Sequence, residues 1–566
     1  MKYPSPFRAW CQKVLPAVYD DSLSYYEVLC KVMAKINEVI DALDIRDAEV
    51  DSLLNWFNNL DVAAEVTAQI TAKLDQMAES GELDRIIGNY LTTYLDLRIL
   101  YHFNTVADML ADSEIKHGYV VQTMGYHKFN DGGGATYAIR TADGTYTANG
   151  YDILNVGRDN LLAILISPDG NILKFGAKAE VAYDNAPHIQ AAVNRGADVI
   201  IPPGNFGMDS VVTIPTGSGA RRINGNGMGA SGAVLYMGVN AYFNVIADST
   251  FFNGLRFIGK NLTNNNGQRC IFAQGQNLLD TDLWVENCIF SYFEKAVRVN
   301  GRGCQVHNTM FVHCTECVSY NFVGQSGNNA MTHNILGGRG LAVTNCRVHS
   351  VPLNLTRDSG AITIEAGSTV FNMLITDNQM DTGVDSFVRC YGDCYGGLIA
   401  NNIINLCQAQ NIHFSGIVDG LRIIGNSFMN AQKLVNGNRA SAIIRFDGST
   451  TKNCAINNNY FYGADRYGVT YAAGAIGCSV DGNTWDDIAS DNNASYTYVW
   501  WSGGFDKCSI CNNVVSERYG DVVYFARSNS TADKASNCVC LANTFVDGLG
   551  FNTTWFPTDT NTVQTY

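Results

Sequence analysis

The first hundred residues carry a helical pattern of apolar positions. These positions recur at alternating steps of four and three residues, first at Val32, Ile36, Val39 and Leu43 and again at Val50, Leu53, Phe57 and Leu60. A heptad spacing of this kind predicts helices that bury one apolar seam. Two arrangements remain open for residues 1–100: an amphipathic helical hairpin within one chain, or a short coiled coil that joins identical subunits.

The pattern changes near Phe103 to short alternating runs of apolar and polar residues, separated by glycine-rich turns. Alternation with a period of two is typical of half-buried strands, so we expect a small β-rich connector over residues 101–170. One further helix is predicted over residues 185–194, where Asp184 or Asn185 can cap the first turn. Beyond this helix the helical signals largely vanish.

The second half of the chain repeats. A short tract of apolar residues around an anchor Asn recurs at Asn287, Asn308, Asn345, Asn378, Asn402, Asn426, Asn459, Asn483, Asn513 and Asn543. Successive anchors lie 21 to 37 residues apart. Strand-containing repeats of this length predict a mainly β protein, a parallel β-helix over residues 171–550 with a tail over residues 551–566. Because Asn tolerates the left-handed backbone conformation, we expect each anchor to bend its coil at one corner.

The composition supports one long β-structure and disfavours both nucleic-acid binding and membrane insertion. Only 16% of the 566 residues are charged, and 54 glycines stand against 10 prolines. The formal net charge of -15 repels phosphate backbones, so we expect no nucleic-acid partner. The longest purely apolar stretch, Leu161–Ile166, is far shorter than the ~18 residues that cross a membrane. We therefore expect no membrane insertion, and residues 1–20 contain no signal-peptide core.

The 17 cysteines are concentrated late in the chain, fifteen of them from Cys270 onward. An odd number without C-x-x-C pairs at zinc-finger spacing argues for assembly in a reducing cytoplasm. Four of them lie five residues before an anchor Asn and are predicted to stack as one core column: Cys454, Cys478, Cys508 and Cys538. A group with some likeness to a zinc site comprises Cys304, His307, His313, Cys314 and Cys317. We favour core packing for this group and expect no metal or cofactor.

Short motifs add a resemblance to known proteins. Residues 103–110 (FNTVADML), 118–126 (GYVVQTMGY) and 130–134 (NDGGG) resemble the connector of phage tailspikes and depolymerases. Residues 173–177 (LKFGA), 189–193 (IQAAV), 199–204 (VIIPPG) and 223–227 (INGNG) resemble the opening of the right-handed β-helix of the pectate-lyase superfamily. The Asp-rich loop usual in that superfamily is reduced here to Asp184. Residues 7–37 resemble the virion-proximal segment of appendage proteins in phages of Gram-positive bacteria.

The resemblance implies a role at the surface of a phage particle. It implies a homotrimer whose N-terminal helices bind tail or neck proteins and whose β-helix faces a glycan of the host cell surface. The protein would be assembled in the host cytoplasm and would then reside in the virion tail. None of the matching motifs specifies catalysis.

Candidate acidic residues follow three of the anchors. Asp487, Glu517 and Asp547 lie four residues after their anchors, with Asp486 beside the first. Since adjacent coils are ~4.8 Å apart, these carboxylates are predicted to form a column near the spacing used by glycosidases. Like charges at this spacing raise a pKa, as a general acid requires. Flat faces for sugar rings are predicted at Tyr498, Trp500 and Trp501. Solvated turns would also produce such an acidic column.

A second acidic group competes with this column. Its members span two coils and are Glu365, Asp377, Asp381, Asp385 and Asp393, with Tyr391 and Tyr395 nearby as sugar-binding candidates. If the substrate were a wall teichoic acid, carboxylates and His would instead serve phosphodiester cleavage, with or without a metal.

Three functional hypotheses follow. The first is a phage tailspike or appendage protein that adheres to a capsule, wall polysaccharide or teichoic acid. Whether it also depolymerises that glycan is left open. The second is a non-catalytic adhesin or structural tail fibre with the same fold. The third is a free bacterial polysaccharide lyase or hydrolase, which leaves the N-terminal helices without a purpose. Glycan cleavage separates the first from the second.

Overall fold

The computed structural model falls into two compact units, Met1–Arg98 and Ile99–Tyr566, which are described separately. It describes residues 27, 30–31, 33–35, 72–77, 79–80, 100–167, 169–196, 198–217, 222–227, 231–247, 249–260, 268–274, 282–301, 303–322, 340–349, 360–381, 386–407, 409–429, 442–464, 466–488, 496–516, 524–529, 533, 535–545, 550–551 and 563–565. In the first unit these residues are helical, apart from a final turn at residue 80. Most of the predicted heptad pattern lies outside the described residues.

The second unit begins with a five-stranded sheet. Its order is β1-β2-β3-β5-β4. Its strands are β1 (Leu100–Phe103), β2 (Val120–Thr123), β3 (Thr136–Thr141), β4 (Ile153–Asn155) and β5 (Leu161–Leu165). The short helix α6 (Val106–Ala111) follows β1 and starts with a capping box, in which Thr105 and Asp108 each bond to the other's backbone N–H. These elements fall within the stretch predicted to be a β-rich connector.

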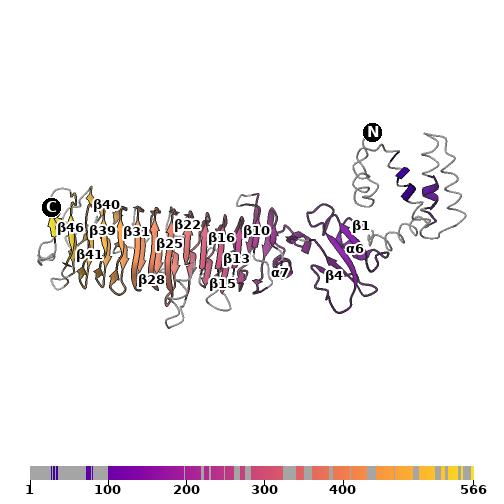
Figure 1. Cartoon of the computed structure of the whole chain (residues 1–566), viewed down its shortest axis with the longest axis horizontal. Coiled ribbons are helices and arrows are strands. Elements are labelled where there is room, and N and C mark those ends of the chain that lie inside the picture. The colour runs from indigo at the N-terminus through magenta and orange to yellow at the C-terminus, as the bar shows by residue number, and fades with distance from the viewer. Residues whose placement is uncertain are drawn as a thin grey trace. The chain divides into compact units, whose positions relative to one another are not determined.

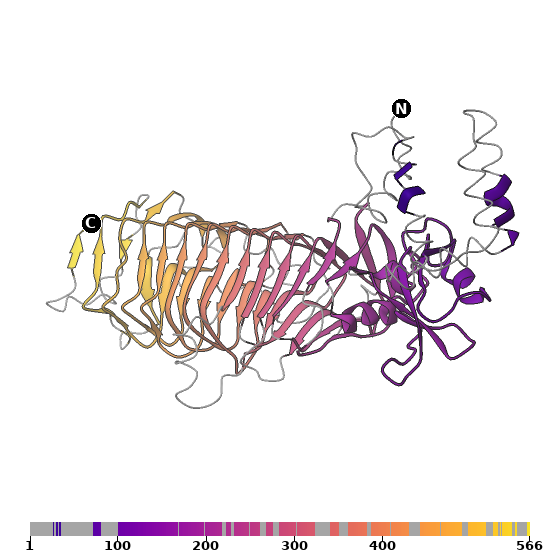
Figure 2. The same ribbon diagram turned by 45° about the vertical axis from the view of Figure 1, so that its right-hand side comes forward.

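A parallel β-helix follows the connector and confirms the predicted mainly β fold. Its coils carry strands to three sheets in turn, as β16, β17 and β18 illustrate, and equivalent strands of successive coils pair in parallel. Figure 2 shows these strands lying side by side along the stack. Near its start lie the 3-10 helix η1 (Ile172–Phe175) and the helix α7 (Ala186–Arg195).

Sheet 1 comprises β6 (Gly170–Asn171), β7 (Val199–Ile201), β10 (Arg222–Gly225), β13 (Ser249–Asn253), β16 (Asp282–Glu286), β19 (Gly303–His307), β22 (Leu341–Thr344), β25 (Thr369–Thr376), β28 (Asp393–Ala400), β31 (Val418–Ile424), β34 (Thr451–Lys452), β35 (Ala455–Asn457), β38 (Ala475–Ile476), β39 (Ser479–Asp481), β42 (Phe505–Asp506) and β45 (Ala535–Ser536). The strands β46 (Val539–Leu541) and β48 (Val563–Thr565) form a separate pair.

Sheet 2 comprises β8 (Gly204–Met208), β11 (Ala233–Met237), β14 (Leu255–Gly259), β17 (Ile289–Ser291), β20 (Met310–Val312), β23 (Arg347–His349), β26 (Gln379–Met380), β29 (Ile403–Asn405), β32 (Ser427–Met429), β36 (Tyr460–Ala464), β40 (Thr484–Ile488) and β43 (Val514–Val515). Sheet 3 comprises β9 (Val212–Ile214), β12 (Phe243–Val245), β15 (Arg269–Gln274), β18 (Lys295–Asn300), β21 (Glu316–Tyr320), β24 (Gly360–Ile364), β27 (Ser386–Cys390), β30 (Ile412–Phe414), β33 (Ala442–Phe446), β37 (Tyr467–Tyr471), β41 (Thr497–Trp501), β44 (Tyr524–Ser528) and β47 (Gly550–Phe551).

The helix predicted over residues 185–194 is confirmed as α7. Asp184 Oδ1 accepts hydrogen bonds from Ala186 N at 3.0 Å and from Asp209 N at 2.8 Å. The other carboxylate oxygen accepts from Ser210 Oγ at 2.8 Å. Asp184 therefore joins the start of α7 to the segment that follows β8, which is a structural role.

The anchor asparagines belong to two adjacent columns, not to one. Asn287, Asn308 and Asn345 have positive φ, as predicted. From Asn378 onward the prediction is wrong by one residue, because the left-handed corner falls on the preceding residue, such as Asp377 or Asn401. The later anchors are instead the core-facing Asn378, Asn402, Asn426, Asn459, Asn483, Asn513 and Asn543, which donate side chain to side chain along the stack at 2.8 to 3.1 Å.

The predicted cysteine column is confirmed. The register that pairs Ala455 with Ser479 and continues through Ser509 places Cys454, Cys478, Cys508 and Cys538 at equivalent positions, and all four are buried. In the zinc-like group, Cys304, Cys314 and Cys317 are buried, whereas His307 is exposed. Burial raises the pKa of the Cys314 thiol to about 12, as expected for a neutral packing residue.

Two features are absent from the described residues. No helix among them is long and apolar enough to cross a membrane. Within the same ranges, no three His, Cys, Asp or Glu side chains are grouped so that they could hold a metal ion.

Candidate active site on sheet 3

The outward face of sheet 3 carries a column of polar and basic side chains. The strand register aligns, coil after coil, Phe272, Arg298, Ser319, Thr363, Arg389, His413, Arg445, Thr470, Trp500 and Arg527. Two residues further along each coil, a second column includes Glu365, Tyr391, Ser415 and Asp447. The side chains alternate along each strand, so the flanking residues point into the apolar core. We call these two columns the polar face of sheet 3.

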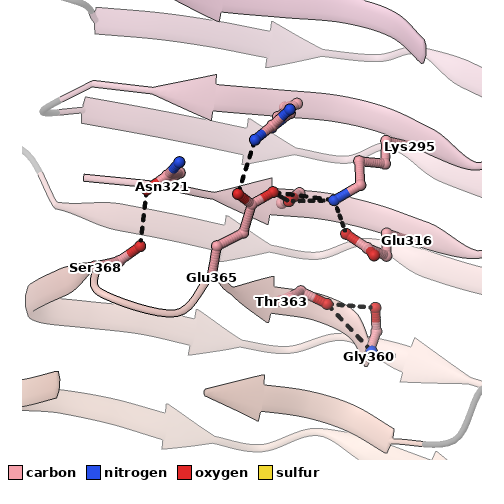
Figure 3. A network of polar contacts seen from close by, with 9 residues as sticks. Lys295, Glu316, Asn321, Gly360, Thr363, Glu365 and Ser368 are labelled. Atoms are coloured by element: carbon pink, nitrogen blue, oxygen red, sulfur yellow. Dashed lines mark hydrogen bonds and ion pairs between the residues drawn. The ribbon is translucent and has the colours of Figure 1, made fainter. Parts of the chain in front are cut away.

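Glu365 is the centre of an ionic network on this face (Figure 3). Its Oε1 accepts from Ser319 Oγ at 2.6 Å and lies 3.0 Å from Lys295 Nζ. Its Oε2 lies 2.8 Å from an Arg298 guanidinium nitrogen. Glu365 directly follows β24, while Lys295 and Arg298 belong to β18, so three successive coils meet at one carboxylate.

Lys295 also holds a second carboxylate. Its Nζ lies 3.0 Å from Glu316 Oε2, and Glu316 occupies the position directly beside Lys295 in the strand register. The nearest oxygens of Glu316 and Glu365 are therefore separated by at most twice that distance. The exposed fractions of the two side chains are 13% and 18%, so both are largely shielded from solvent, and the Glu316 oxygen that faces Lys295 is buried.

The surroundings shift the pKa values of the two carboxyl groups in opposite directions. Burial raises the pKa of Glu316, and the charge of Lys295 offsets only part of this effect. Burial also acts to raise the pKa of Glu365, but the hydrogen bonds from Ser319 and Lys295, with the charges of Lys295 and Arg298, outweigh burial and lower it. Such divergence within one carboxylate pair is how a site obtains both an acid and a base.

The two carboxyl groups are close enough for glycoside chemistry. Retaining glycosidases place their two carboxyl groups about 5–5.5 Å apart, and inverting ones about 6.5–9.5 Å apart. The upper limit set by Lys295 applies to the nearest oxygens of the pair, and it is compatible with the retaining class. Glu316 is suited to donate a proton, and Glu365 to act as the ionised group.

The sequence predicted one member of this pair as a site residue and not the other. Glu365 belongs to the competing acidic group, whereas Glu316, Lys295, Arg298 and Ser319 were missed. The signal that could have found them is the register of β18 and β21, which pairs Lys295 with Glu316. The long segment between β21 and β22 interrupts the anchor spacing after this pair and hides the relation of Glu316 to Glu365 in the next coil.

The other members of the competing acidic group do not converge on Glu365. Asp377 lies at a left-handed corner, Asp381 follows β26 of sheet 2 near His349, and Asp393 begins β28 of sheet 1. Asp385 lies outside the described residues. The prediction of one cluster is therefore wrong for the three described aspartates, because the coil turns between sheets and separates them.

The structure describes only part of the acidic column predicted from Asp486, Asp487, Glu517 and Asp547. Asp486 and Asp487 lie in β40 of sheet 2, with Asp487 in the left-handed conformation at φ 52°. Asp486 Oδ2 accepts from Tyr460 Oη at 3.2 Å, and Asp487 Oδ1 is buried without a hydrogen-bond partner. Glu517 and Asp547 lie outside the described residues, so the column stays a prediction.

Two of the predicted sugar-binding aromatics are wrong. Tyr498 and Trp501 have exposed fractions of 0% and pack inside the β-helix, where Tyr498 contacts Phe525 and Trp501 stacks on Phe505. The sequence placed them outward because consecutive aromatics in β41 hide which positions alternate inward. Trp500 does lie on the polar face of sheet 3, and so does Tyr391, over which the Arg389 guanidinium is 4.8 Å from the ring centroid. Tyr395 stacks on Phe371 in sheet 1.

His413, Ser415 and Asp447 form a second polar group on this face. His413 Nε2 lies 2.9 Å from Asp447 Oδ2 and 3.4 Å from Ser415 Oγ. A catalytic triad needs the acid on one ring nitrogen and the nucleophile on the other. Here both groups meet the same nitrogen, and His413 Nδ1 is buried without a hydrogen-bond partner. This arrangement therefore does not activate a serine nucleophile.

Comparisons with known proteins give distant structural similarities alone. Neither a family model nor a curated relative matches the sequence. Similar solved structures include tailspike protein 2 of Escherichia coli O157:H7 bacteriophage CAB120, 12% identical with a TM-score of 0.42, over 80% of this chain and 53% of that one. The tailspike of Acinetobacter baumannii phage AM24 is 12% identical with a TM-score of 0.37, over 79% of this chain and 65% of that one. The GH87 α-1,3-glucanase of Streptomyces thermodiastaticus is 10% identical with a TM-score of 0.37, over 69% and 73%. This chain spans about half of the first tailspike.

Proposed function

We propose that this protein is a phage tailspike-type receptor-binding protein that adheres to a host cell-surface glycan and cleaves it at the Glu316/Glu365 pair. The observation that carries the proposal is this pair, bridged by Lys295 on the outer face of a β-helix, with pKa values shifted in opposite directions. The connector and appendage motifs of the sequence support the placement in a phage tail.

The proposed reaction uses each carboxyl group in its own protonation state. Protonated Glu316 donates its proton to the glycosidic oxygen as the bond from that oxygen to the anomeric carbon breaks. Ionised Glu365 attacks the anomeric carbon and forms a glycosyl ester. Water then hydrolyses the ester while the Glu316 carboxylate accepts its proton. Lys295 and Arg298 hold Glu365 in place, and Ser319 restricts its rotamer.

The assembly is part of the same proposal. The β-helix forms a homotrimer, the N-terminal helices bind tail or neck proteins, and the glycan meets the β-helix.

The proposed function is tested by titrating fluorescently labelled full-length protein on a panel of bacterial strains. We expect saturable adsorption to some strains, competition by polysaccharide extracted from those strains, and new reducing ends when that polysaccharide is incubated with the protein. Adsorption that disappears when the cells are treated with protease, and that the extracted polysaccharide does not compete, would contradict a glycan receptor. Competition without new reducing ends would leave the adhesin and remove the enzyme.

The pH dependence of cleavage is a separate prediction. Activity requires ionised Glu365, whose pKa is lowered, so activity falls only when the pH drops below the ordinary range of a glutamate. It also requires protonated Glu316, whose pKa is raised, so activity falls as the pH rises through a value above that range. The expected profile of kcat/KM is a bell that brackets the ordinary glutamate value. Activity that keeps rising into the alkaline range would refute Glu316 as the acid.

A further inference from the structure

The outer face of sheet 1 carries a ladder of planar side chains that stops abruptly. The register aligns Arg222, Phe251, Trp284, Gln305 and Ala342 in five successive coils. The Arg222 guanidinium lies 5.2 Å from the centroid of Phe251, and the rings of Phe251 and Trp284 are stacked with centroids 5.2 Å apart at 24°. The ladder of planar groups ends at Trp284, because the next two positions of the column are Gln305, which is flexible, and Ala342, which has only a methyl group.

A shallow pocket opens beside Gln305 and Ala342, the two positions that follow Trp284 in this column. Its volume is about 290 Å³. The lining residues come from β16, β19 and β22 and are Trp284, Glu286, Gln305, Val306, His307, Ala342 and Thr344. Ala342 leaves space here because its side chain is only a methyl group. Leu374, at the next position of the same column, is again large and exposed. The pocket is close to the lower limit of about 300 Å³ for small-molecule sites, which suits a single small ring.

The polar groups of the pocket lie in the neighbouring column. Glu286, His307 and Thr344 occupy equivalent positions in consecutive coils, so their spacing is that of adjacent strands. His307 Nδ1 lies 2.9 Å from Thr344 Oγ1. Among the described residues this is the hydrogen bond of the His307 ring, so Nε2 remains available to a ligand. A carboxylate, an imidazole and an amide thus border one aromatic face.

We propose that this pocket binds one neutral pyranose unit of the host glycan. The C–H face of the sugar packs on the Trp284 ring and continues the ladder, while its hydroxyls bond to Glu286, Gln305 and His307. The Glu286 carboxylate disfavours uronic acids and phosphorylated sugars at this position. The inference rests on the proposed adhesion to a glycan and not on cleavage, because the Glu316/Glu365 pair lies on sheet 3.

Saturation-transfer NMR on the full-length protein tests the pocket. The probes are methyl glucopyranoside, methyl galactopyranoside, N-acetylglucosamine and, as an anion of matched size, glucuronate. We expect transfer to the ring C–H protons of at least one neutral probe, a loss of at least tenfold in affinity for Trp284→Ala, and a smaller loss for Trp284→Phe. Absence of transfer to every neutral probe from the unmodified protein would overturn the proposal.

Two further variants sharpen this test. Ala342→Phe fills the pocket and leaves the aromatic ladder intact, so it is expected to abolish binding even if Trp284→Ala fails to fold. Tyr236→Ala removes a half-buried aromatic from sheet 2 and is the matched control, expected to bind as the unmodified protein does. Full binding by Ala342→Phe would contradict the site. If the pocket variants lose sugar binding while Glu365→Gln still cleaves polysaccharide, the pocket is supported and the proposed cleavage site is wrong. If the pocket variants keep sugar binding while Glu365→Gln loses cleavage, the cleavage site is supported and the pocket is wrong.

Discussion

Replacing Glu365 by Gln is expected to lower the rate of glycan cleavage by at least about 10⁴-fold, because it removes the covalent nucleophile of the proposed reaction. Gln keeps the size of the side chain and can still accept from Ser319, but it cannot attack the anomeric carbon. The fold should survive, because Glu365 follows the strand β24 and lies outside the apolar core, and Gln has the same size. Release of reducing ends from the extracted polysaccharide, measured at equal protein concentrations, checks the prediction.

Two further variants show whether a loss of cleavage in Glu365→Gln is specific to that position. Asp419→Asn changes a surface carboxylate of sheet 1 that accepts from Asn453 Nδ2 at 2.8 Å, and it is expected to leave cleavage within twofold. Asp486→Asn tests the rival acidic column on sheet 2. If Asp486→Asn abolishes cleavage and Glu365→Gln does not, the active site lies on sheet 2 and the assignment to sheet 3 is wrong.

Replacing Asn402 by Ala is expected to destabilise the β-helix by about 3–5 kcal/mol, since it leaves several buried polar groups without partners at about 1–3 kcal/mol each. Asn402 has an exposed fraction of 0% and donates to Ile375 O at 2.9 Å and to Asn426 Oδ1 at 2.8 Å. It also accepts from Asn378 N at 3.0 Å and Asn378 Nδ2 at 2.9 Å. The urea midpoint of the full-length protein, read by circular dichroism, measures the loss.

The residue before it is the matched control. Asn401 is exposed and has φ 56°, and among the described residues its side chain donates a single long hydrogen bond, of 3.3 Å to Asp377 Oδ1. Glycine adopts this conformation without strain, so Asn401→Gly is expected to change the stability by less than about 1 kcal/mol. Equal midpoints for the two variants would show that the buried ladder contributes no more than the corner does.

The repeat was predictable because its strongest signals are local. An Asn beside apolar residues at each corner, and a Cys five residues before four of the anchors, mark the same register in every coil. The two Asn columns were merged, however, because adjacent residues carry the same amino acid, as in Asn401 and Asn402. Only the core burial of one and the positive φ of the other separate them.

The candidate site was harder to predict because it depends on alignment across coils of unequal length. Three residues separate β20 from β21, whereas twelve separate β32 from β33. Such connections shift the sequence spacing without shifting the strands. Glu316 and Glu365 are 49 positions apart in the sequence, yet both contact one Lys295 side chain. Spacing alone instead favoured Asp487 and its neighbours.

The most direct test of the central claim is a structure of the Glu365→Gln variant with an oligosaccharide from a glycan that the protein binds. The proposed function predicts a glycosidic oxygen within hydrogen-bond distance of the Glu316 carboxyl group, and an anomeric carbon facing residue 365. An oligosaccharide bound only along β40, beside Asp486 and Asp487, with the polar face of sheet 3 empty, would contradict it.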